Sequence, residues 1–304
     1  MPPPDISVII LTFNEEIHIR RCIENIRPVA RDIFVVDSFS SDQTVAIAES
    51  LGAVVLQNSW EHNYARQFNW ALAHCPVKSK WILRLDADEY LMPELLEEVR
   101  TKLEALTPDI TGIICKRRHI FLGRWVKNGI YPVRLLRLFQ TGKAVCEQRQ
   151  MDEHIQLLEG EAVEFDHDFV DHNLRDLSWW SHKHVDYAVR EAADMLDMEL
   201  GLTDGDTALS GQAGRKRRVK SLYIRLPLFA RAFAYFLYRY VFRLGFLEGK
   251  EGFLWNVLQG FWYRLLVDAK IFEIKKACGR DPAKIREHLR RQYHLEFDDA
   301  PPHA

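Results

Sequence analysis

The sequence of 304 residues predicts an α/β protein built on a mostly parallel sheet, and three observations support this prediction. Short apolar or β-branched runs alternate with segments of helical periodicity four times between residues 6 and 85. Acidic or amide side chains follow three of these four runs. Hydrophobic residues make up 47% of the chain, which is enough for a sizeable core. Together these features indicate a Rossmann-like, doubly wound sheet flanked by helices.

The first two strands are expected over residues 6–11 and 33–36, which are rich in Ile and Val. A helix is expected over 17–26, where apolar residues recur at helical spacing. The second strand ends in a stretch of Ser and Asp residues, which are good N-caps for a helix over 43–51. Gly52 then ends that helix, because glycine readily adopts the left-handed conformation found at helix C-termini.

A third strand at 53–56 and a helix at 64–74 lead to Trp81–Leu85, which is predicted to be the fourth buried strand. Asp86 and Asp88 follow this strand directly. Because side chains alternate along a strand, both carboxylates point the same way and could hold one hard cation such as Mg²⁺ or Mn²⁺. The alternative is a solvated turn. The polar ends of several strands at one edge of a sheet favour a ligand site.

Motifs that the sequence lacks exclude several classes of protein. No Gly-x-Gly-x-x-Gly follows the first strand and no Gly-x-x-x-x-Gly-Lys-Ser/Thr occurs, which disfavours dinucleotide dehydrogenases and P-loop enzymes. Five cysteines without a Cys-x-x-Cys suggest neither a disulfide framework nor a zinc site, and they fit a reducing cytosol. The first residues lack the basic and apolar regions of a secretory signal.

The second half of the chain continues the alternation. Apolar residues recur at helical spacing over 91–106, and another helix opens at Trp179. Three further strands are expected, at residues 111–115, 134–139 and 164–172. Residues 201–214 are rich in Gly, Thr, Ser and Asp, so this segment is expected to be a loop at a domain boundary.

The region after that loop is strongly basic, with ten Lys or Arg residues and one acid between residues 215 and 250, in a chain of net charge −2. Residues 227–243 predict an aromatic, amphipathic helix on which Arg231, Arg239 and Arg243 share one arc. We expect this helix to lie in the headgroup layer of a membrane with its arginines on anionic lipid. The alternative is a helix packed on the rest of the protein, with its arginines in solvent or paired with acids.

Four segments together resemble the donor-binding half of glycosyltransferase family 2, which are inverting enzymes of GT-A fold. These segments are residues 7–16, 35–44, 65–69 and 82–89, and their order and spacing also match. Within that family the chain most resembles the bacterial lipopolysaccharide-core glucosyltransferase type, and the similarity extends to residues 245–252. The resemblance implies a GT-A catalytic domain over 1–214, with a donor half at 1–110 and an acceptor half at 111–214. A basic, aromatic, membrane-associating region would follow over 215–304.

The resemblance also implies donor-binding roles for residues that match the family's motifs. Asp37 would contact the nucleotide base, Asp86 would lie near the ribose or the sugar, and Asp88 would ligate the metal at the diphosphate. Further donor-binding residues would be Thr12, Asn14 and Glu15 along the nucleotide cleft, and Arg66 facing a phosphate or the base. An ordinary charge on a helix surface is the alternative for Arg66.

Other implied roles concern the acceptor, the phosphate and the metal. Trp125 would stack on an acceptor sugar, and Lys183 would reach the leaving phosphate. His172 would be a third metal ligand beside Asp86 and Asp88. Each role has a simpler alternative: a Trp packed beneath its loop, a Lys on an exposed helix, and a structural His.

The displacement at the anomeric carbon that this resemblance implies needs one base to take the proton of the acceptor hydroxyl. The leaving diphosphate is stabilised by the metal instead of by a protonated acid. Family members carry the base within an acidic pair, where this chain has the sequence Gln150-Met-Asp-Glu-His-Ile155. Glu153 is the expected base and Asp152 the second candidate, and the departure from the family's usual pairs leaves that choice open.

The sequence therefore predicts a metal-dependent, inverting glycosyltransferase that moves a sugar from a nucleotide-diphosphate sugar to a lipid-linked or cell-envelope glycan. It would use Mg²⁺ or Mn²⁺ and act peripherally at the cytoplasmic face of the cell membrane. It would bind no nucleic acid, because basic residues are scarce outside the tail. The alternatives are a catalytically silent glycan- or nucleic-acid-binding module and a sugar nucleotidyltransferase. The latter needs a Gly-rich, Arg-containing phosphate loop after the first strand, which residues 12–16 do not form.

Overall fold

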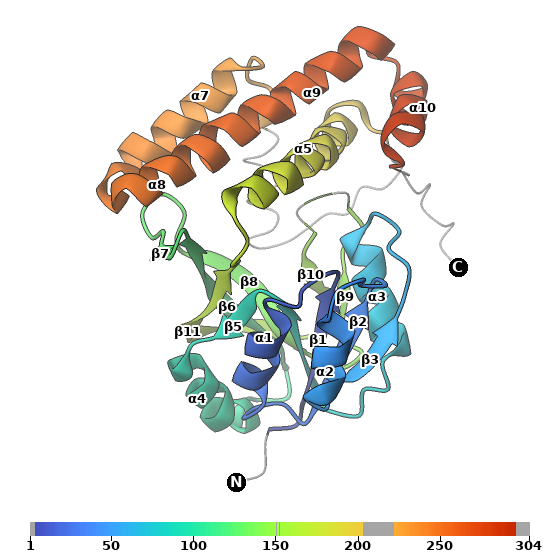
Figure 1. Cartoon of the computed structure of the whole chain (residues 1–304), viewed down its shortest axis with the longest axis vertical. Coiled ribbons are helices and arrows are strands. Elements are labelled where there is room, and N and C mark those ends of the chain that lie inside the picture. Colours follow the sequence, from blue (N-terminus) through green and yellow to red (C-terminus); the bar gives the residue numbers. More distant parts are fainter. Residues whose placement is uncertain (1–3, 150, 152, 203–221, 296–304) are drawn as a thin grey trace. The chain divides into compact units, whose positions relative to one another are not determined.

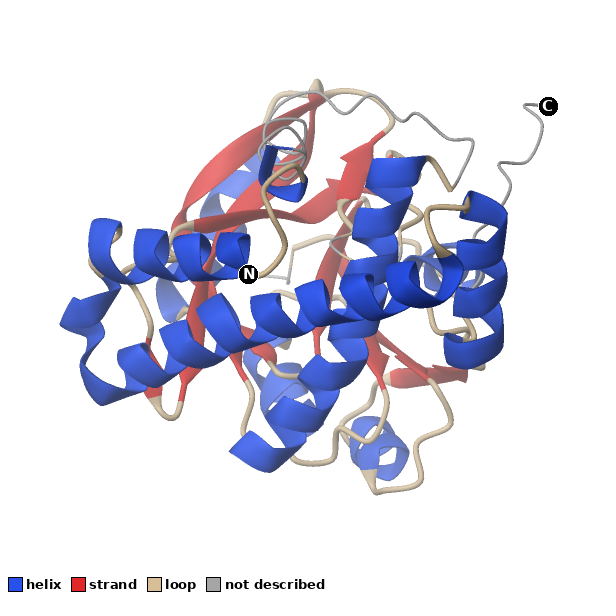
Figure 2. Ribbon diagram, turned by 90° about the horizontal axis from the view of Figure 1, so that it is seen from above, coloured by secondary structure: helices blue, strands red, loops and turns tan. Residues whose placement is uncertain are grey.

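The computed structural model describes residues 4–149, 151, 153–202 and 222–295, and the chain divides into two compact units. Unit 1 comprises residues 1–148 and 153–174, and unit 2 comprises residues 149–152 and 175–304. Unit 1 holds every described strand, and the described part of unit 2 consists of helices and loops (Figures 1 and 2). The domain boundary predicted after residue 214 lies outside the described residues and stays a prediction.

Unit 1 is built on one mixed sheet with the strand order β3-β2-β1-β4-β8-β6-β11-β5 (Figure 1). Its strands are β1 (Ile6–Thr12), β2 (Asp32–Asp37), β3 (Val54–Gln57), β4 (Trp81–Asp86), β5 (Glu89–Leu91), β6 (Ile110–Phe121), β8 (Val133–Gln140) and β11 (Glu161–His172), with β7 (Arg124–Trp125) paired to β6. Strands β1, β2, β3, β4, β6 and β11 run in one direction, whereas β8 and β5 are antiparallel to their neighbours. The predicted α/β class with a mostly parallel sheet is confirmed.

Helices cover both faces of this sheet because its buried strands alternate their side chains. On one face, Val8 and Ile10 of β1 belong to a core shared with α1 (Ile19–Ile26), α2 (Thr44–Ser50) and α4 (Pro93–Lys102), which continues into the 3₁₀ turn η1 (Leu103–Ala105). On the other face, Ile9 packs with α3 (Tyr64–His74). The period of two along β1 thus divides the apolar side chains between two layers of helices.

The sheet curls so that β5 returns to the end of β4. Only Ala87 and Asp88 separate Asp86 on β4 from Glu89 on β5. Three residue steps reach about 11 Å at most, whereas four strand spacings would place β5 about 19 Å from β4 in a flat sheet. The pairing of β4 with β8 covers only residues 81–83, so the sheet is free to bend beyond that point. The bend brings the acidic turn against β11, where Glu89 is in register with Asp171.

Three short strands were not predicted from the sequence, and several predicted strands are longer in the structure. Strand β5 and the hairpin of β9 (Ala144–Cys146) and β10 (Ile155–Leu157) have three residues in each strand, too few to give a periodic pattern. Strand β6 runs beyond the predicted 111–115 because its charged residues pair with acids on β11. For example, Arg118 Nε donates to Asp168 Oδ2 at 2.6 Å.

Unit 2 is organised around one apolar core between α5, α9 and α10. Its described helices are α5 (Leu177–Leu200), α7 (Ala230–Leu237), α8 (Gly249–Trp255), α9 (Tyr263–Cys278) and α10 (Pro282–Tyr293), with π-helical turns η2 (Tyr238–Phe242) and η4 (Asn256–Trp262) and the 3₁₀ turn η3 (Gly245–Glu248). Among the residues that the structure describes, no helix combines the length and the apolar character needed to cross a membrane.

The helix predicted over 227–243 is present as α7 and η2, but two of its three arginines do not face outward as expected. Arg231 is 2% exposed, and its Nε donates to Asp268 Oδ1 at 2.7 Å. Arg239 is 3% exposed, and only Arg243 lies on the surface. The prediction that Arg231 and Arg239 contact lipid is therefore wrong. Periodicity could not show this, because the acid that neutralises Arg231 lies 37 residues later, on α9.

Glu98 on α4 anchors β11 and provides a test of stability. Its carboxylate accepts the backbone N–H groups of Asp166 and His167, each at 3.0 Å, and pairs with Lys102 Nζ at 2.8 Å. Burial opposes ionisation, but these hydrogen bonds outweigh it and lower the pKa of Glu98 to about 2 from an ordinary 4.5. Because the folded-state pKa is the lower one, this stabilisation is present above pH 4.5 and is lost as the pH falls toward 2.

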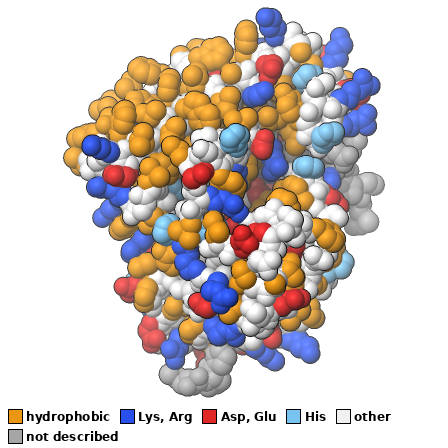
Figure 3. Space-filling model, in the orientation of Figure 1, with side chains coloured by type: hydrophobic (Ala, Val, Ile, Leu, Met, Phe, Trp, Pro, Cys, Tyr) orange, Lys and Arg blue, Asp and Glu red, His pale blue; other side chains and the backbone are white. Residues whose placement is uncertain are grey.

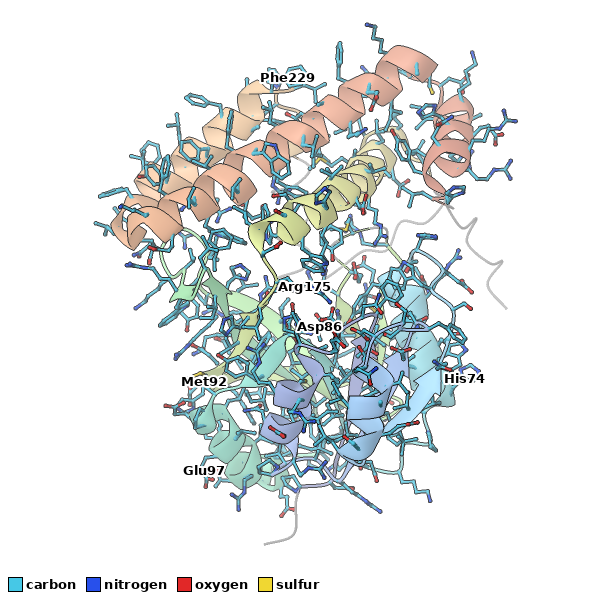
Figure 4. All side chains as sticks on the ribbon, in the orientation of Figure 1. His74, Asp86, Met92, Glu97, Arg175 and Phe229 are labelled. Atoms are coloured by element: carbon cyan, nitrogen blue, oxygen red, sulfur yellow. The ribbon has the colours of Figure 1, made fainter. Side chains whose placement is uncertain are left out.

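Glu98→Gln should lower the free energy of unfolding by about 1–2 kcal/mol at neutral pH, and the deficit should shrink in acid, as measured by urea titrations across this pH range. Glu97→Gln is the matched control, because the Glu97 side chain is 64% exposed and points outward from α4 (Figure 4). The control should change stability by less than about 0.5 kcal/mol. A deficit for Glu98→Gln that does not vary with pH would contradict the role of the carboxylate charge.

Candidate functional site

The carboxyl ends of the parallel strands bring several predicted residues to one edge of the sheet. Thr12 at the end of β1 is in register with Asp37 at the end of β2, and Leu11 is in register with Asp86 at the end of β4. Figure 4 shows Asp86 at this edge of unit 1. Open α/β sheets bind ligands at such an edge.

Asp37 is fully buried and organises the turn that follows β2. Its carboxylate accepts hydrogen bonds from Thr12 Oγ1 at 2.9 Å and from the backbone N–H of Ser40 at 2.7 Å. The hydroxyl of Ser40 donates to the same carboxylate. These contacts fix the position of Asp37, and its predicted contact with a nucleotide base stays a prediction.

The loop after β1 is tied to the loop after β2 and to the end of β11. Asn14 adopts a positive φ of 55°, and its side-chain oxygen accepts the backbone N–H of Ser41 at 2.8 Å. The Glu15 carboxylate contacts Nδ1 of the buried His18 at 2.5 Å. His18 Nε2 accepts the backbone N–H of Leu174 at 2.8 Å, so the ring carries its proton on Nδ1 and donates it to Glu15.

Asp86 is held by a buried chain formed by Arg84 and Tyr64. Arg84 Nε donates to Tyr64 Oη at 3.0 Å, and Tyr64 Oη donates to Asp86 Oδ1 at 2.5 Å. The guanidinium of Arg84 also lies over the Tyr64 ring, 4.3 Å from its centroid. Burial alone would raise the pKa of Asp86, but the charges of Arg84 and Arg137 and the hydrogen bond from Tyr64 hold it below its usual value. Asp86 is therefore ionised at neutral pH.

Glu89 directly follows the two aspartates and is also buried. Its Oε2 accepts the backbone N–H of Asp86 at 2.9 Å, and its Oε1 is paired with Arg137. Burial is the main cause that raises the pKa of Glu89, to about 8; Arg137 opposes the rise, and the charges of Asp86 and Asp171 add to it. Arg137 is thus the cation that faces Glu89 within this turn.

Asp88 and His172 are joined by Arg21 of α1. The backbone oxygen of Asp88 accepts Arg21 Nη2 at 3.1 Å and the backbone N–H of His172 at 3.0 Å, while Asn173 Nδ2 donates to Asp88 Oδ2 at 2.9 Å. Arg21 Nη1 donates to His172 Nδ1 at 3.3 Å. A guanidinium can only donate, so a neutral His172 carries its proton on Nε2. Burial and the charge of Arg21 both lower the pKa of His172, which favours this neutral form.

The carboxylate oxygens of Asp86 and Asp88 suit a hard divalent cation, whereas His172 in this orientation does not. Ligation through Nε2 requires that nitrogen to be unprotonated, and ligation through Nδ1 would displace Arg21. Within the described residues, no group of three or more His, Cys, Asp or Glu side chains is placed to hold a metal ion. Asp86 and Asp88 stay predicted ligands, and the prediction for His172 requires Arg21 to move.

Glu153 lies in the connection between β9 and β10, two residues before Ile155. Burial lowers the pKa of Arg84, but the charges of four neighbouring groups outweigh burial and raise this pKa. These groups are Tyr64, Asp86, Cys146 and Glu153. Glu153 is thus within electrostatic range of the guanidinium that supports Asp86. The second candidate base, Asp152, lies outside the described residues.

Trp125 on β7 is packed among cations. The Cζ atom of Arg118 lies 4.4 Å from the centroid of its ring and Nζ of Lys127 lies 5.4 Å from it, while Tyr131 meets it edge-on at 5.3 Å. The Trp125 side chain therefore has the contacts expected of a ring packed within its loop. Stacking on an acceptor sugar stays a prediction.

Two predicted phosphate ligands lie in different units. Arg66 is in the first turn of α3, and its Nη1 pairs with Glu61 Oε2 at 3.3 Å. Lys183 belongs to α5 of unit 2, where its ammonium lies 4.6 Å from the centroid of the Trp179 ring. Their roles toward phosphate stay predictions.

Sequence reasoning missed four of the residues that support the two aspartates, which are Tyr64, Arg84, Glu89 and Arg21. A signal existed for Arg84, since it is the lone charge within the apolar run 81–85 and a buried charge needs a partner. Glu89 adjoins the motif itself. Nothing in the local pattern marks Tyr64 or Arg21, because each reaches the site from a helix distant in sequence.

Tyr64→Phe removes the hydroxyl that joins Arg84 to Asp86 and takes one hydrogen-bond partner from each. It should lower the free energy of unfolding by about 1–3 kcal/mol, measured by chemical denaturation. Tyr90→Phe is the control, because Tyr90 contacts Arg21 through its ring, which the substitution keeps. Cζ of Arg21 lies 4.9 Å from the centroid of the Tyr90 ring. Tyr90→Phe should change stability by less than about 0.5 kcal/mol. Equal losses in the two variants would contradict a special role of the Tyr64 hydroxyl, because both variants keep the ring and lose one hydroxyl.

Comparison with known proteins identifies the stretch that contains this site. The family model described as Glycosyl transferase family 2 matches residues 7–155, which include β1 to β4, the two aspartates and Glu153. An uncharacterized glycosyltransferase of Rickettsia bellii (strain RML369-C) is 46% identical over 94 residues, 31% of this chain and 31% of that protein. The chain thus matches only about a third of the length of this curated relative.

A longer match is to the lipopolysaccharide core biosynthesis glycosyltransferase LpsC of Rhizobium meliloti (strain 1021), 27% identical over 280 residues, 90% of this chain and 94% of that protein. Among solved structures, mannosyltransferase PcManGT from Pyrobaculum calidifontis, in complex with GDP-Man and Mn²⁺, gives a TM-score of 0.49 at 17% identity and covers 90% of this chain and 88% of that chain. The match to the family model places residues 7–155 of this chain in glycosyl transferase family 2.

Proposed function

We propose that the protein transfers a sugar from a nucleotide-diphosphate sugar to a hydroxyl group of a glycan, with inversion at the anomeric carbon. The observation that carries this proposal is the position of Asp37, Asp86 and Asp88 at the carboxyl ends of strands within the family-matched stretch. The charges of Arg84 and Arg137 hold the pKa of Asp86 below its usual value, so Asp86 is ionised, which is the state that a ligand for a cation needs. This combination supports binding of a donor that carries a diphosphate.

In this proposal the donor lies along Thr12, Asn14, Glu15, Asp37 and Arg66. Asp86 and Asp88 would hold Mg²⁺ or Mn²⁺, because hard oxygen ligands suit such an ion. The bound ion would offset the negative charge of the departing diphosphate. Lys183 would add a positive charge at the same phosphates, and His172 would join the metal only after Arg21 released it.

Glu153 is proposed as the base that takes the proton from the acceptor hydroxyl. A single base is enough for a direct displacement, and Glu153 lies within electrostatic range of Arg84, as Asp86 does. Asp152 stays the second candidate. Trp125 is proposed to stack on the acceptor sugar if its cationic neighbours make room.

The acceptor is proposed to be a lipid-linked or cell-envelope glycan, reached at the cytoplasmic face of the cell membrane. The support is the similarity to LpsC across 90% of this chain, since that protein is described as acting in lipopolysaccharide core biosynthesis.

Asp88→Ala should abolish metal-dependent donor binding, because it removes one of two proposed carboxylate ligands. A thermal-shift screen of nucleotide sugars with Mn²⁺ would first identify the donor. Calorimetric titration of that donor with and without Mn²⁺ then checks the variant. Asp32→Ala is the control, since Asp32 is at the opposite end of β2 and its side chain is 41% exposed. An affinity that Asp88→Ala leaves unchanged would refute the metal assignment.

Glu153→Gln should leave donor binding intact while lowering turnover by about 10²-fold or more, because the amide cannot accept the proton. Initial rates at saturating donor provide the measurement. Glu159→Gln is the control, with a side chain that is 61% exposed and paired with Lys143. Near-normal turnover of Glu153→Gln would move the role of base to Asp152.

A further inference from the structure

Unit 2 carries an exposed apolar surface that the proposed transfer reaction does not use. Of the 23 large hydrophobic side chains exposed in the described part of the chain, 14 lie between residues 222 and 272. We call the central members of this group the apolar face: Phe229, Phe233, Phe242, Phe246, Leu247 and Phe253. Phe242 is the most exposed of them, at 75%. Hydrophobic side chains gather over α7 and α8 in Figure 3.

Half-buried aromatic rings join three members of the apolar face to one another. Phe233 and Phe236 both contact Phe261, at centroid distances of 6.3 and 6.1 Å. Phe236 stacks on Tyr240 at 5.3 Å. Tyr240 in turn meets two exposed rings, Phe246 at 6.3 Å and Phe253 at 5.8 Å. Phe233, Phe246 and Phe253 therefore belong to one packed layer of rings that extends from α7 to α8.

The exposed charges of the segment 222–247 are of one sign, and Lys250 and the half-buried Glu251 follow it on α8. Residues 222–247 contain four arginines and no Asp or Glu. Two of the four, Arg231 and Arg239, are buried, so the exposed charges of this segment are those of Arg225 and Arg243. The first acid after it, Glu248, is 5% exposed. An apolar centre with a cationic rim complements anionic lipid headgroups above their acyl chains.

A second copy of the chain fits this surface less well. Two copies that met face to face would bring the same cationic rims together, and like charges across an interface oppose association. A contiguous apolar patch of this kind on a folded surface marks an interaction site, and the charge pattern favours lipid over a second copy.

We propose that the apolar face inserts into the interfacial layer of an anionic phospholipid bilayer, and that burial of its rings supplies most of the affinity. The buried Arg231 supports α7 from within through Asp268 and does not bind lipid. This inference rests on the proposed function in one respect: the membrane would carry the lipid-linked acceptor. Because apolar burial is not screened by salt, binding should persist at ionic strengths that remove purely electrostatic adsorption.

The test uses the full-length chain and sedimentation with unilamellar vesicles of phosphatidylcholine containing roughly 30% phosphatidylglycerol. Raising NaCl from about 0.1 to about 0.5 M should weaken binding by no more than roughly threefold. The double variant Phe242→Ser/Phe246→Ser should weaken it on the order of tenfold at both salt concentrations. Leu158→Ser, at a side chain 64% exposed in unit 1, is the matched control and should bind as the unchanged chain does. Loss of binding in high salt, with no effect of the double variant, would overturn the proposal.

A second measurement reports insertion directly. Cys22, Cys75, Cys115 and Cys146 are buried, so a Phe242→Cys chain that also carries Cys278→Ser can be labelled at one exposed thiol with a polarity-sensitive dye. Vesicles should shift its emission to the blue, whereas the same dye on Leu158→Cys should not respond. An unshifted emission at residue 242 would overturn the proposal.

Two further readouts separate this proposal from other outcomes. Light scattering tests the second copy: a dimer that the double variant dissociates without changing vesicle binding would overturn insertion. Calorimetric donor binding is measured on the same variants. Normal donor affinity with lost vesicle binding supports the membrane role, and failure of donor binding in the unchanged chain would count against the proposed transfer reaction alone.

Discussion

The ionised state of Asp86 depends on two arginines that are themselves buried, and the rest of unit 1 is arranged to keep these charges together. Removal of one partner from a buried ion pair leaves an uncompensated charge, which is far more costly than the pair itself. Arg84 comes from the same strand as Asp86, whereas Arg137 comes from β8 and Glu89 from β5. The sheet thus brings together groups from three strands, and Glu89 contacts both Arg137 and the backbone N–H of Asp86.

The curl of the sheet is also needed to bring these groups together. A flat sheet would hold β5 and β11 too far from the end of β4 for Glu89 to accept the backbone N–H of Asp86. Bending brings the ends of β4 and β11 together, and Arg21 then joins the backbone oxygens of Asp88 and His172. The candidate donor site is therefore a product of tertiary curvature as well as of strand order.

Local patterns in the sequence predicted most of the donor half. The helix predicted over 64–74 matches α3 residue for residue, and the fourth strand differs from β4 by one residue. These elements have strong periodicity and clear caps, so tertiary contacts did not have to override them. Asp86 and Asp88 were found because an apolar run stops abruptly at two acids, a contrast that is visible without a structure.

What the sequence could not predict depends on partners far away along the chain. The three-residue strands have no period of their own, and Arg231 appeared to be a surface charge because Asp268 is on another helix. The same reason hid Tyr64, which hydrogen-bonds to a carboxylate 22 residues later. The resemblance to GT-A enzymes implies that His172, at the end of a strand, is a metal ligand, whereas in the structure Arg21 donates a hydrogen bond to its ring.

The two-residue connection from β4 to β5 restricts how this chain can diverge. Its residues Ala87 and Asp88 form a turn that leads from one strand to another that is not its neighbour in the sheet. A deletion there would pull Glu89 out of its register with Asp171, and an insertion would turn its side chain to the opposite face. Side chains in this turn can be exchanged, but its length cannot, so homologous proteins that keep this fold should show no gap between Asp86 and Glu89.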